Sequence, residues 1–183
     1  MSLCFIQILF KNLFIAGVFV ALSCMNCARI GTSCCTHYQI ILTTGDIQRI
    51  SDFLGHQNFF ILEPPVLEDI EPDYDPFWMP MVLKPEGVVC VLKRTREKSC
   101  VLLTETGCSL PYDRRPLICR LYPYKYTEEG ILGIDTDCPI SGEKEWGCVL
   151  DTLDMPTAKA KQWISLLYAE VRNEIKPLHE AIP

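Results

Sequence analysis

The order of apolar and polar positions predicts a strand followed by a helix in the first third of the chain. Residues 38–42 are rich in aromatic and β-branched side chains, which favours a short strand. Thr43 and Asp46 are placed to cap a helix that runs to about Leu54, where Gly55 provides a stop. The apolar residues of this helix recur at helical spacing and form its expected core face: Ile47, Ile50, Phe53 and Leu54.

Two hairpins are predicted in the middle of the chain. Residues 81–83 and 88–93 are strand-like and flank a turn at 84–87, and residues 100–103 continue the strand pattern. Residues 122–126 and 131–135 flank a second turn at 127–130. Before the first hairpin, residues 63–80 carry five prolines and six acidic residues without a basic one, which predicts an extended acidic loop.

A long helix is predicted near the C-terminus, beginning at Asp154 and Pro156 and ending at Pro177. Its apolar stripe consists of Ala160, Trp163, Ile164, Leu167, Val171 and Ile175. With 183 residues the chain is long enough for one hydrophobic core. We therefore expect a small single domain of the α+β class, with short strands and hairpins, one N-terminal helix and one C-terminal helix.

The first 24 residues differ from the rest because residues 3–22 are almost continuously apolar. A transmembrane anchor would place Lys11 near mid-span, at a cost of about 2.5–3.5 kcal/mol. A signal peptide would use Ala21 and Ser23 at its cleavage site, and a lipoprotein would be modified at Cys24. A start at Met25 is the favoured interpretation. We therefore expect a cytoplasmic protein, with export or membrane anchoring through residues 1–24 as the alternative.

The net charge excludes one class of function, and the cysteine content points to another. The net charge of -6 argues against a protein that binds nucleic acid through its phosphate backbone. The 11 cysteines include an N-terminal group and a distal group, with Cys90 and Cys148 as outliers. The two groups are Cys24, Cys27, Cys34 and Cys35, and Cys100, Cys108, Cys119 and Cys138.

Thiolates suit zinc and iron–sulfur centres, and four of them complete a closed zinc site or hold one cluster. The adjacent pair Cys34 and Cys35 is informative because neighbouring side chains in extended backbone point to opposite faces. Unless a tight turn brings the two together, the pair serves different metals. The pair is therefore evidence, though weak, for a polynuclear or two-site centre.

Residues 107–123, GCSLPYDRRPLICRLYP, resemble the C-x-[IL]-Y-x-x-RP-x-x-C-R-x-[YF]-P signature of the YkgJ-type, CxxCxxCC cysteine-cluster family. Residues 100–103, with C-x-[FL]-L, and residues 137–139, with the closing C-P, resemble its flanking elements. Residues 27–35 and 42–47 resemble its opening cysteine motif and its L-T-x-x-D-I helix start. The resemblance spans about residues 27–139 and implies a bacterial domain that chelates zinc or iron. We expect this domain to cover residues 25–150, with residues 151–183 as a helix packed on it.

The resemblance also implies a set of metal ligands: Cys27, Cys34, Cys35, Cys100, Cys108, Cys119 and Cys138. Ile30 stands where the family pattern has its second cysteine, and His37 is a candidate eighth ligand, although a structural histidine is the commoner case. Arg115 and Arg120 lie among these cysteines, where guanidinium groups would offset the negative charge of a thiolate centre and so bind the cofactor. The alternative is that they are surface arginines.

The expected function is metal chelation through thiolates, with zinc or an iron–sulfur cluster as the cofactor. The adjacent cysteine pair and the excess of thiols favour iron–sulfur slightly. The alternative is an iron–sulfur enzyme resembling flagellin lysine N-methylase, or a redox protein. Its partner would be a protein substrate or a redox protein, but no methyl-donor loop or catalytic residue is recognisable. Membrane contact is expected only if residues 1–24 are an anchor.

Overall fold

The structure is a computed structural model that describes residues 34–66, 75–135, 138 and 155–179. The helices are α3 (Cys34–His37), α4 (Thr44–Leu54), α5 (Trp78–Val82), α6 (Leu117–Leu121) and α8 (Thr157–His179), with a 3-10 helix η3 (Tyr112–Arg114). The antiparallel strand pairs are β1 (Phe60–Glu63) with β2 (Val89–Leu92), β3 (Leu103–Thr104) with β4 (Gly107–Cys108), and β5 (Tyr124–Thr127) with β6 (Gly130–Ile134). This arrangement confirms the α+β class.

The predicted leader, residues 1–24, lies outside the described residues. Within the described ranges, no helix is both long and apolar enough to cross a membrane.

Helix α4 confirms the predicted cap and stop. The Thr43 hydroxyl accepts a hydrogen bond from the Asp46 backbone N–H, the Asp46 carboxylate accepts one from the Thr43 N–H, and Gly55 ends the helix with a φ of 73°. The predicted core face is wrong at Phe53, which is 49% exposed. Asp46 and Ile50, four residues apart, are the buried residues of this helix, whereas Phe53 lies in its last turn, next to the Gly55 stop.

The first predicted hairpin is wrong. Residues 78–82 form helix α5, in which Pro80 is tolerated because an N–H in the first helical turn needs no partner within the helix. The turn at 84–87 is present, with the Gly87 N–H donating to the Lys84 carbonyl at 2.9 Å, but it leads from a helix into β2. The partner of β2 is β1, with Phe60 opposite Leu92.

The remaining predicted elements are largely confirmed. The second hairpin is β5–β6, with a register irregularity between Lys125 and Tyr126. The predicted strand at 38–42 is reduced to a single bridge between Ile41 and Val91. Helix α8 continues to His179, so the predicted end at Pro177 is wrong.

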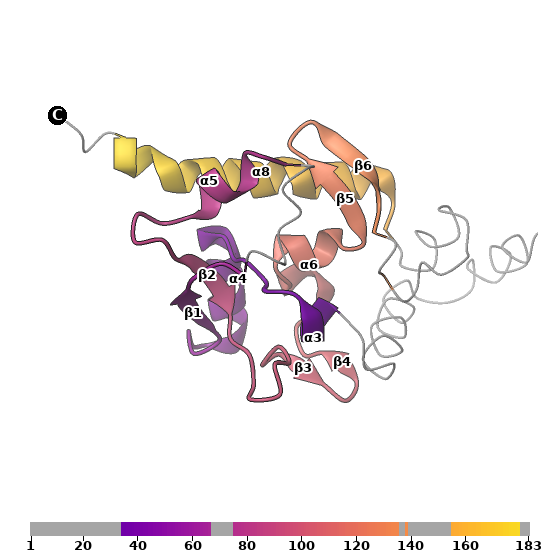
Figure 1. Cartoon of the computed structure of the whole chain (residues 1–183). Helices are drawn as coiled ribbons and strands as arrows, with labels where there is room; N and C mark the ends of the chain where they lie inside the picture. Colours follow the sequence, from indigo (N-terminus) through magenta and orange to yellow (C-terminus); the bar gives the residue numbers. More distant parts are fainter. Residues whose placement is uncertain (1–33, 67–74, 136–137, 139–154, 180–183) are drawn as a thin grey trace, which may run out of the picture.

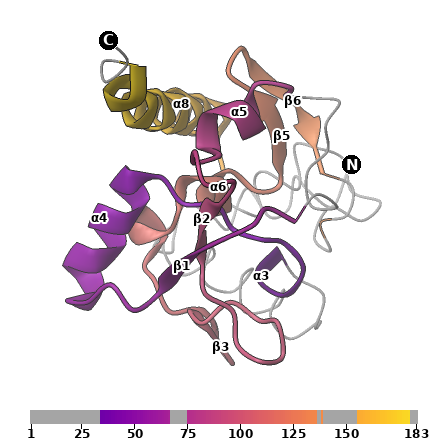
Figure 2. The same ribbon diagram turned by 60° about the vertical axis from the view of Figure 1, so that its left-hand side comes forward.

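Two hydrophobic cores share the short helix α6. The first core lies under α4, β2 and the β3–β4 hairpin and includes Ile50 and Leu110, whereas the second lies under α8 and includes Leu167 and Val171. Ile118 of α6 packs against both. Figure 1 shows α6 between α8 on one side and α3 with β3–β4 on the other, and Figure 2 shows α4 and β1–β2 beside them.

We predict that Ile50→Ala and Phe53→Ala will differ sharply in their effect on stability. Ile50 is fully buried, so its truncation is expected to lower the free energy of unfolding by about 2–5 kcal/mol. Phe53 is half exposed, and its truncation should cost well under half as much. Urea unfolding monitored by circular dichroism measures both. Equal losses would contradict the orientation of α4.

Candidate metal centre

Four of the predicted cysteine ligands meet in the first core although they come from separate segments. Cys35 lies in α3, Cys108 in β4 and Cys119 in α6, while Cys100 precedes β3. Cys100 is a buried member of this core, and the other three are partly buried and pack against it. We call these four residues the thiol cluster.

Backbone hydrogen bonds hold three members of the thiol cluster in register. The Cys100 N–H donates to the Cys35 carbonyl at 2.7 Å, which ties α3 to the segment that precedes β3. The hairpin pairs Leu103 with Cys108. The Leu102 N–H donates to the Cys100 sulfur at 3.4 Å, a contact that also stabilises a thiolate at this position.

The thiols of the cluster interact electrostatically. Burial raises the pKa of Cys119 well above its ordinary value, and the neighbouring thiols of Cys35, Cys108 and Cys100 raise it further. Burial likewise raises the pKa of Cys100 to about 12, with smaller upward contributions from Cys35 and Cys108 and a downward one from the Leu102 N–H. Each thiol thus opposes ionisation of the others, which is the situation that a bound cation relieves.

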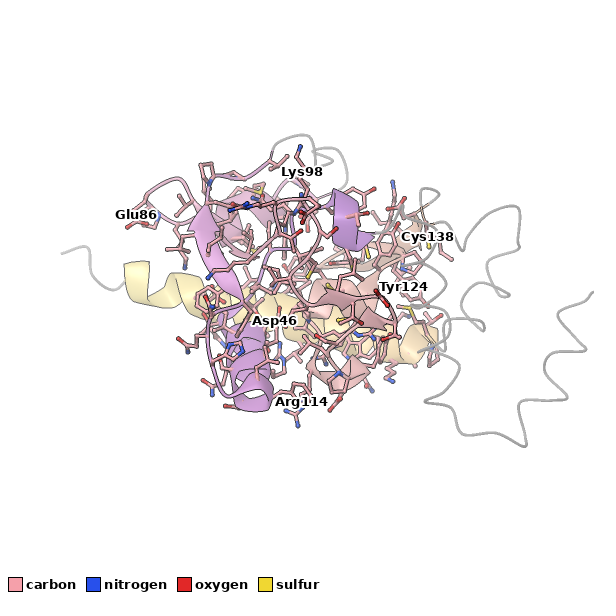
Figure 3. The ribbon with its side chains drawn as sticks, turned by 90° about the horizontal axis from the view of Figure 1, so that it is seen from below. Asp46, Glu86, Lys98, Arg114, Tyr124 and Cys138 are labelled. Atoms are coloured by element: carbon pink, nitrogen blue, oxygen red, sulfur yellow. The ribbon has the colours of Figure 1, made fainter. Side chains whose placement is uncertain are left out.

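The two other described pattern cysteines, Cys34 and Cys138, both act electrostatically on Tyr122. Burial raises the pKa of Tyr122 strongly, and Asp135, Cys138 and Cys34 raise it further. Cys138 is buried and is labelled in Figure 3. Cys34 and Cys35 both lie in helix α3, so the extended backbone considered for this pair in the sequence is wrong.

The remaining candidates are not part of either group as described. Cys27, Cys24 and Cys148 lie outside the described residues, as does the side chain of His37. Cys90 is buried in β2, where burial raises the pKa of its thiol to about 11. The structure thus places Cys90 in the hydrophobic core.

The described thiols do not form a closed metal site as they stand. No disulfide joins any two of the cysteines in the described part of the chain. Within those same ranges, no three Cys, His, Asp or Glu side chains are close enough together to hold a metal ion. The donor set itself fits zinc or iron, because four thiolates are a standard complement for either.

A family model decides what kind of domain this is. The model CxxCxxCC, described as "Putative zinc- or iron-chelating domain", matches residues 23–139. The chain belongs to the CxxCxxCC family. Comparisons with curated proteins and with solved structures found no match. The family match includes Cys24, which the sequence reasoning left out of the ligand set, as well as all seven predicted cysteine ligands.

Both predicted cofactor-binding arginines of this CxxCxxCC domain are buried. The Arg115 Nε donates to the Leu110 carbonyl at 3.2 Å, and the Arg120 Nε donates to the Arg115 carbonyl at 2.7 Å. Burial lowers the pKa of Arg120, as does the nearby charge of Arg49, while Asp46 opposes them. One terminal nitrogen of Arg120 is buried without a hydrogen-bond partner in the described structure. Neither arginine is therefore a surface residue, and their contact with a cofactor stays a prediction.

Sequence reasoning identified Asp46 only as a helix-capping residue, but Asp46 also holds the cysteine-bearing helix. Its carboxylate is fully buried and accepts hydrogen bonds from the Leu117 N–H at 3.0 Å and from Arg49 at 2.6 Å. Leu117 is the first residue of α6, and Cys119 follows two positions later. Figure 3 labels Asp46 on α4. The capping pattern could not predict the contact between Asp46 and Leu117, because the two residues are 71 positions apart in the sequence.

We predict that Cys100 in the metal-free protein will react with iodoacetamide as a thiol of very high pKa. Its pKa is raised from 9.0 to about 12, so the labelling rate should rise about tenfold per pH unit from pH 7 to 10 without a plateau. Mass spectrometry of the labelled peptide measures this rate. In urea-unfolded protein the rate should level off near pH 9. The same plateau in folded protein would contradict the burial of this thiol.

Proposed function

We propose that this protein chelates zinc or iron through the thiolates of Cys35, Cys100, Cys108 and Cys119. The observation that carries the proposal is the convergence of these thiols, from four separate segments, on one core. The second support is their mutual electrostatic influence on the pKa values of Cys100 and Cys119. Membership of a zinc- or iron-chelating family supports the same function class.

Metal binding would change the protonation of these thiols. Burial keeps the pKa values of Cys100 and Cys119 high, so both thiols are protonated at neutral pH without a metal. A bound cation requires thiolates, and therefore each ligand must release its proton on binding. We expect metal affinity to fall as the pH falls, and we expect the four thiols to move closer together when the metal binds.

We further propose a second centre that involves Cys34 and Cys138. The support is that both residues influence the buried Tyr122, whereas Cys35 influences Cys100 and Cys119. Cys27 is the remaining candidate for this centre by sequence pattern. Division of the adjacent pair between two centres would also explain why the family pattern contains more thiols than one tetrahedral site needs.

An iron–sulfur cluster is the form of cofactor that the number of thiols slightly favours, and zinc is the alternative. The spare buried donor of Arg120 supports its retention as a candidate cofactor-binding residue. No observation favours the methylase-like or redox enzyme over simple chelation, so we propose chelation alone.

We predict that Cys119→Ala and Cys90→Ala will differ in metal content, because Cys119 is a proposed ligand and Cys90 is a cysteine of the hydrophobic core. Both substitutions remove one sulfur atom from a cysteine that contacts the first core. Cys119→Ala is expected to abolish stoichiometric metal binding or weaken it at least about tenfold, because one of four ligands is lost. Cys90→Ala should leave the metal content unchanged, because the charged groups that act on the Cys90 thiol are Lys84 and Glu174 and not other cysteines.

The measurement is elemental analysis of the full chain purified without oxygen, with a visible absorption spectrum to detect an iron–sulfur cluster. Circular dichroism of each variant shows whether the fold is retained. Wild-type protein that folds but holds neither zinc nor iron would refute the proposal. Equal metal loss in both variants would refute the assignment of Cys119.

A further inference from the structure

Two glutamates of α8, one helical turn apart, lie over the first turn of α4. The Thr44 N–H donates to the Glu174 carboxylate at 2.5 Å, and the Thr43 hydroxyl contacts the Glu170 carboxylate. A Cβ atom at Gly45 would overlap the Glu170 carboxyl group, so this close approach requires glycine. The two carboxylates neutralise the positive end of α4, where backbone N–H groups lack partners within the helix.

Arg49 extends this contact from α8 into the interior. Its two terminal nitrogens donate to both oxygens of Glu170, at 2.5 and 3.0 Å, and one of them also donates to Asp46 at 2.6 Å. Asp46 in turn accepts from the Leu117 N–H at 3.0 Å. A continuous series of charge-assisted hydrogen bonds therefore joins α8 to the first residue of α6.

Helix α6 depends on these contacts for its position. It has five residues, too few to be stable as an isolated helix. Leu117 and Leu121 pack in the second core with Leu167 and Val171 of α8, whereas Cys119 packs against the first core. Loss of α8 would therefore remove the packing on one side of α6. It would also remove Glu170, one of the two carboxylates that Arg49 binds.

We propose that docking of α8 is coupled to metal binding at the thiol cluster through Glu170, Arg49, Asp46 and Leu117. The inference rests on the proposed metal site and adds a means of regulating it. Because linkage is reciprocal, bound metal stabilises the docked helix, and docking raises metal affinity by the same factor. The helix begins at Thr157, beyond residues 23–139 that the family model matches. Displacement of α8 would therefore lower the metal affinity.

The experiment uses the full chain and zinc ions, which thiolates bind whether or not the native metal is iron. Glu170→Gln keeps the shape of the side chain and removes the charge that Arg49 contacts. We expect this variant to bind zinc about tenfold more weakly in competition with a chelator. Gly45→Ala should act in the same direction, because it displaces Glu170 without changing the charge.

Arg172→Gln is the matched control, because it removes a charge from the same helix but from an exposed ion pair with Glu128. It should bind zinc as the wild type does. Hydrogen exchange of the α8 backbone provides a second readout. Zinc should slow exchange in the wild type and in Arg172→Gln, and should slow it about tenfold less in Glu170→Gln.

A purely structural role for Glu170 would lower stability without metal but leave the zinc response of α8 unchanged. Zinc binding that requires Cys119, combined with equal affinities for Glu170→Gln and Arg172→Gln and no effect of zinc on α8 exchange, would overturn the coupling and leave the proposed function standing. A wild-type chain that binds no zinc and contains no iron would overturn both.

Discussion

The buried carboxylate of Asp46 is the contact on which the arrangement of the helices depends. It completes the N-terminal cap of α4 with Thr43, binds Arg49 and accepts the backbone N–H of Leu117 at the start of α6. A buried carboxylate is costly unless its oxygens are paired, and here each of its oxygens has a donor. The hydrogen bonds that satisfy this carboxylate therefore fix α6 against α4, and Glu170 holds α8 to α4 through Arg49.

The contact between Asp46 and α6 also determines where the thiol cluster lies. The cluster lies on the side of α6 that faces the first core, and α8 covers the opposite side. Cys108 lies in the β3–β4 hairpin, and Cys100, just before this hairpin, is hydrogen-bonded to Cys35. Cys119 comes from α6. The site is thus assembled from segments that local structure alone would not bring together. Its geometry depends on the packing of both cores.

The local elements of this protein were readable from the sequence, and the long-range contacts were not. Thr43, Asp46 and Gly55 identified α4 because caps and stops act within a few residues. Strand β1 was missed because its pairing with β2 joins residues more than 20 positions apart, such as Phe60 and Leu92. Residues 81–83 were predicted as a strand and residues 78–80 as the end of a loop, although 78–82 form α5, because a short apolar run fits either a strand or a helix.

The same division applies to the candidate site. The family pattern identified which cysteines to consider. The opposite directions expected for Cys34 and Cys35 in extended backbone suggested more than one centre, but the pair lies in helix α3. The pattern contained no information on Glu170 or on the contact between Asp46 and Leu117, since both depend on how distant segments pack. Sequence motifs thus name candidate ligands, whereas the residues that position those candidates come from the folded structure.

A crystal structure of the metal-loaded full chain tests the central claim most directly. The account predicts that the sulfur atoms of Cys35, Cys100, Cys108 and Cys119 surround one metal centre, that Cys34 and Cys138 lie outside it, and that Asp46 still accepts the Leu117 N–H. A centre that binds Cys34 and Cys35 together, or one from which the Cys119 sulfur is absent, would contradict the account.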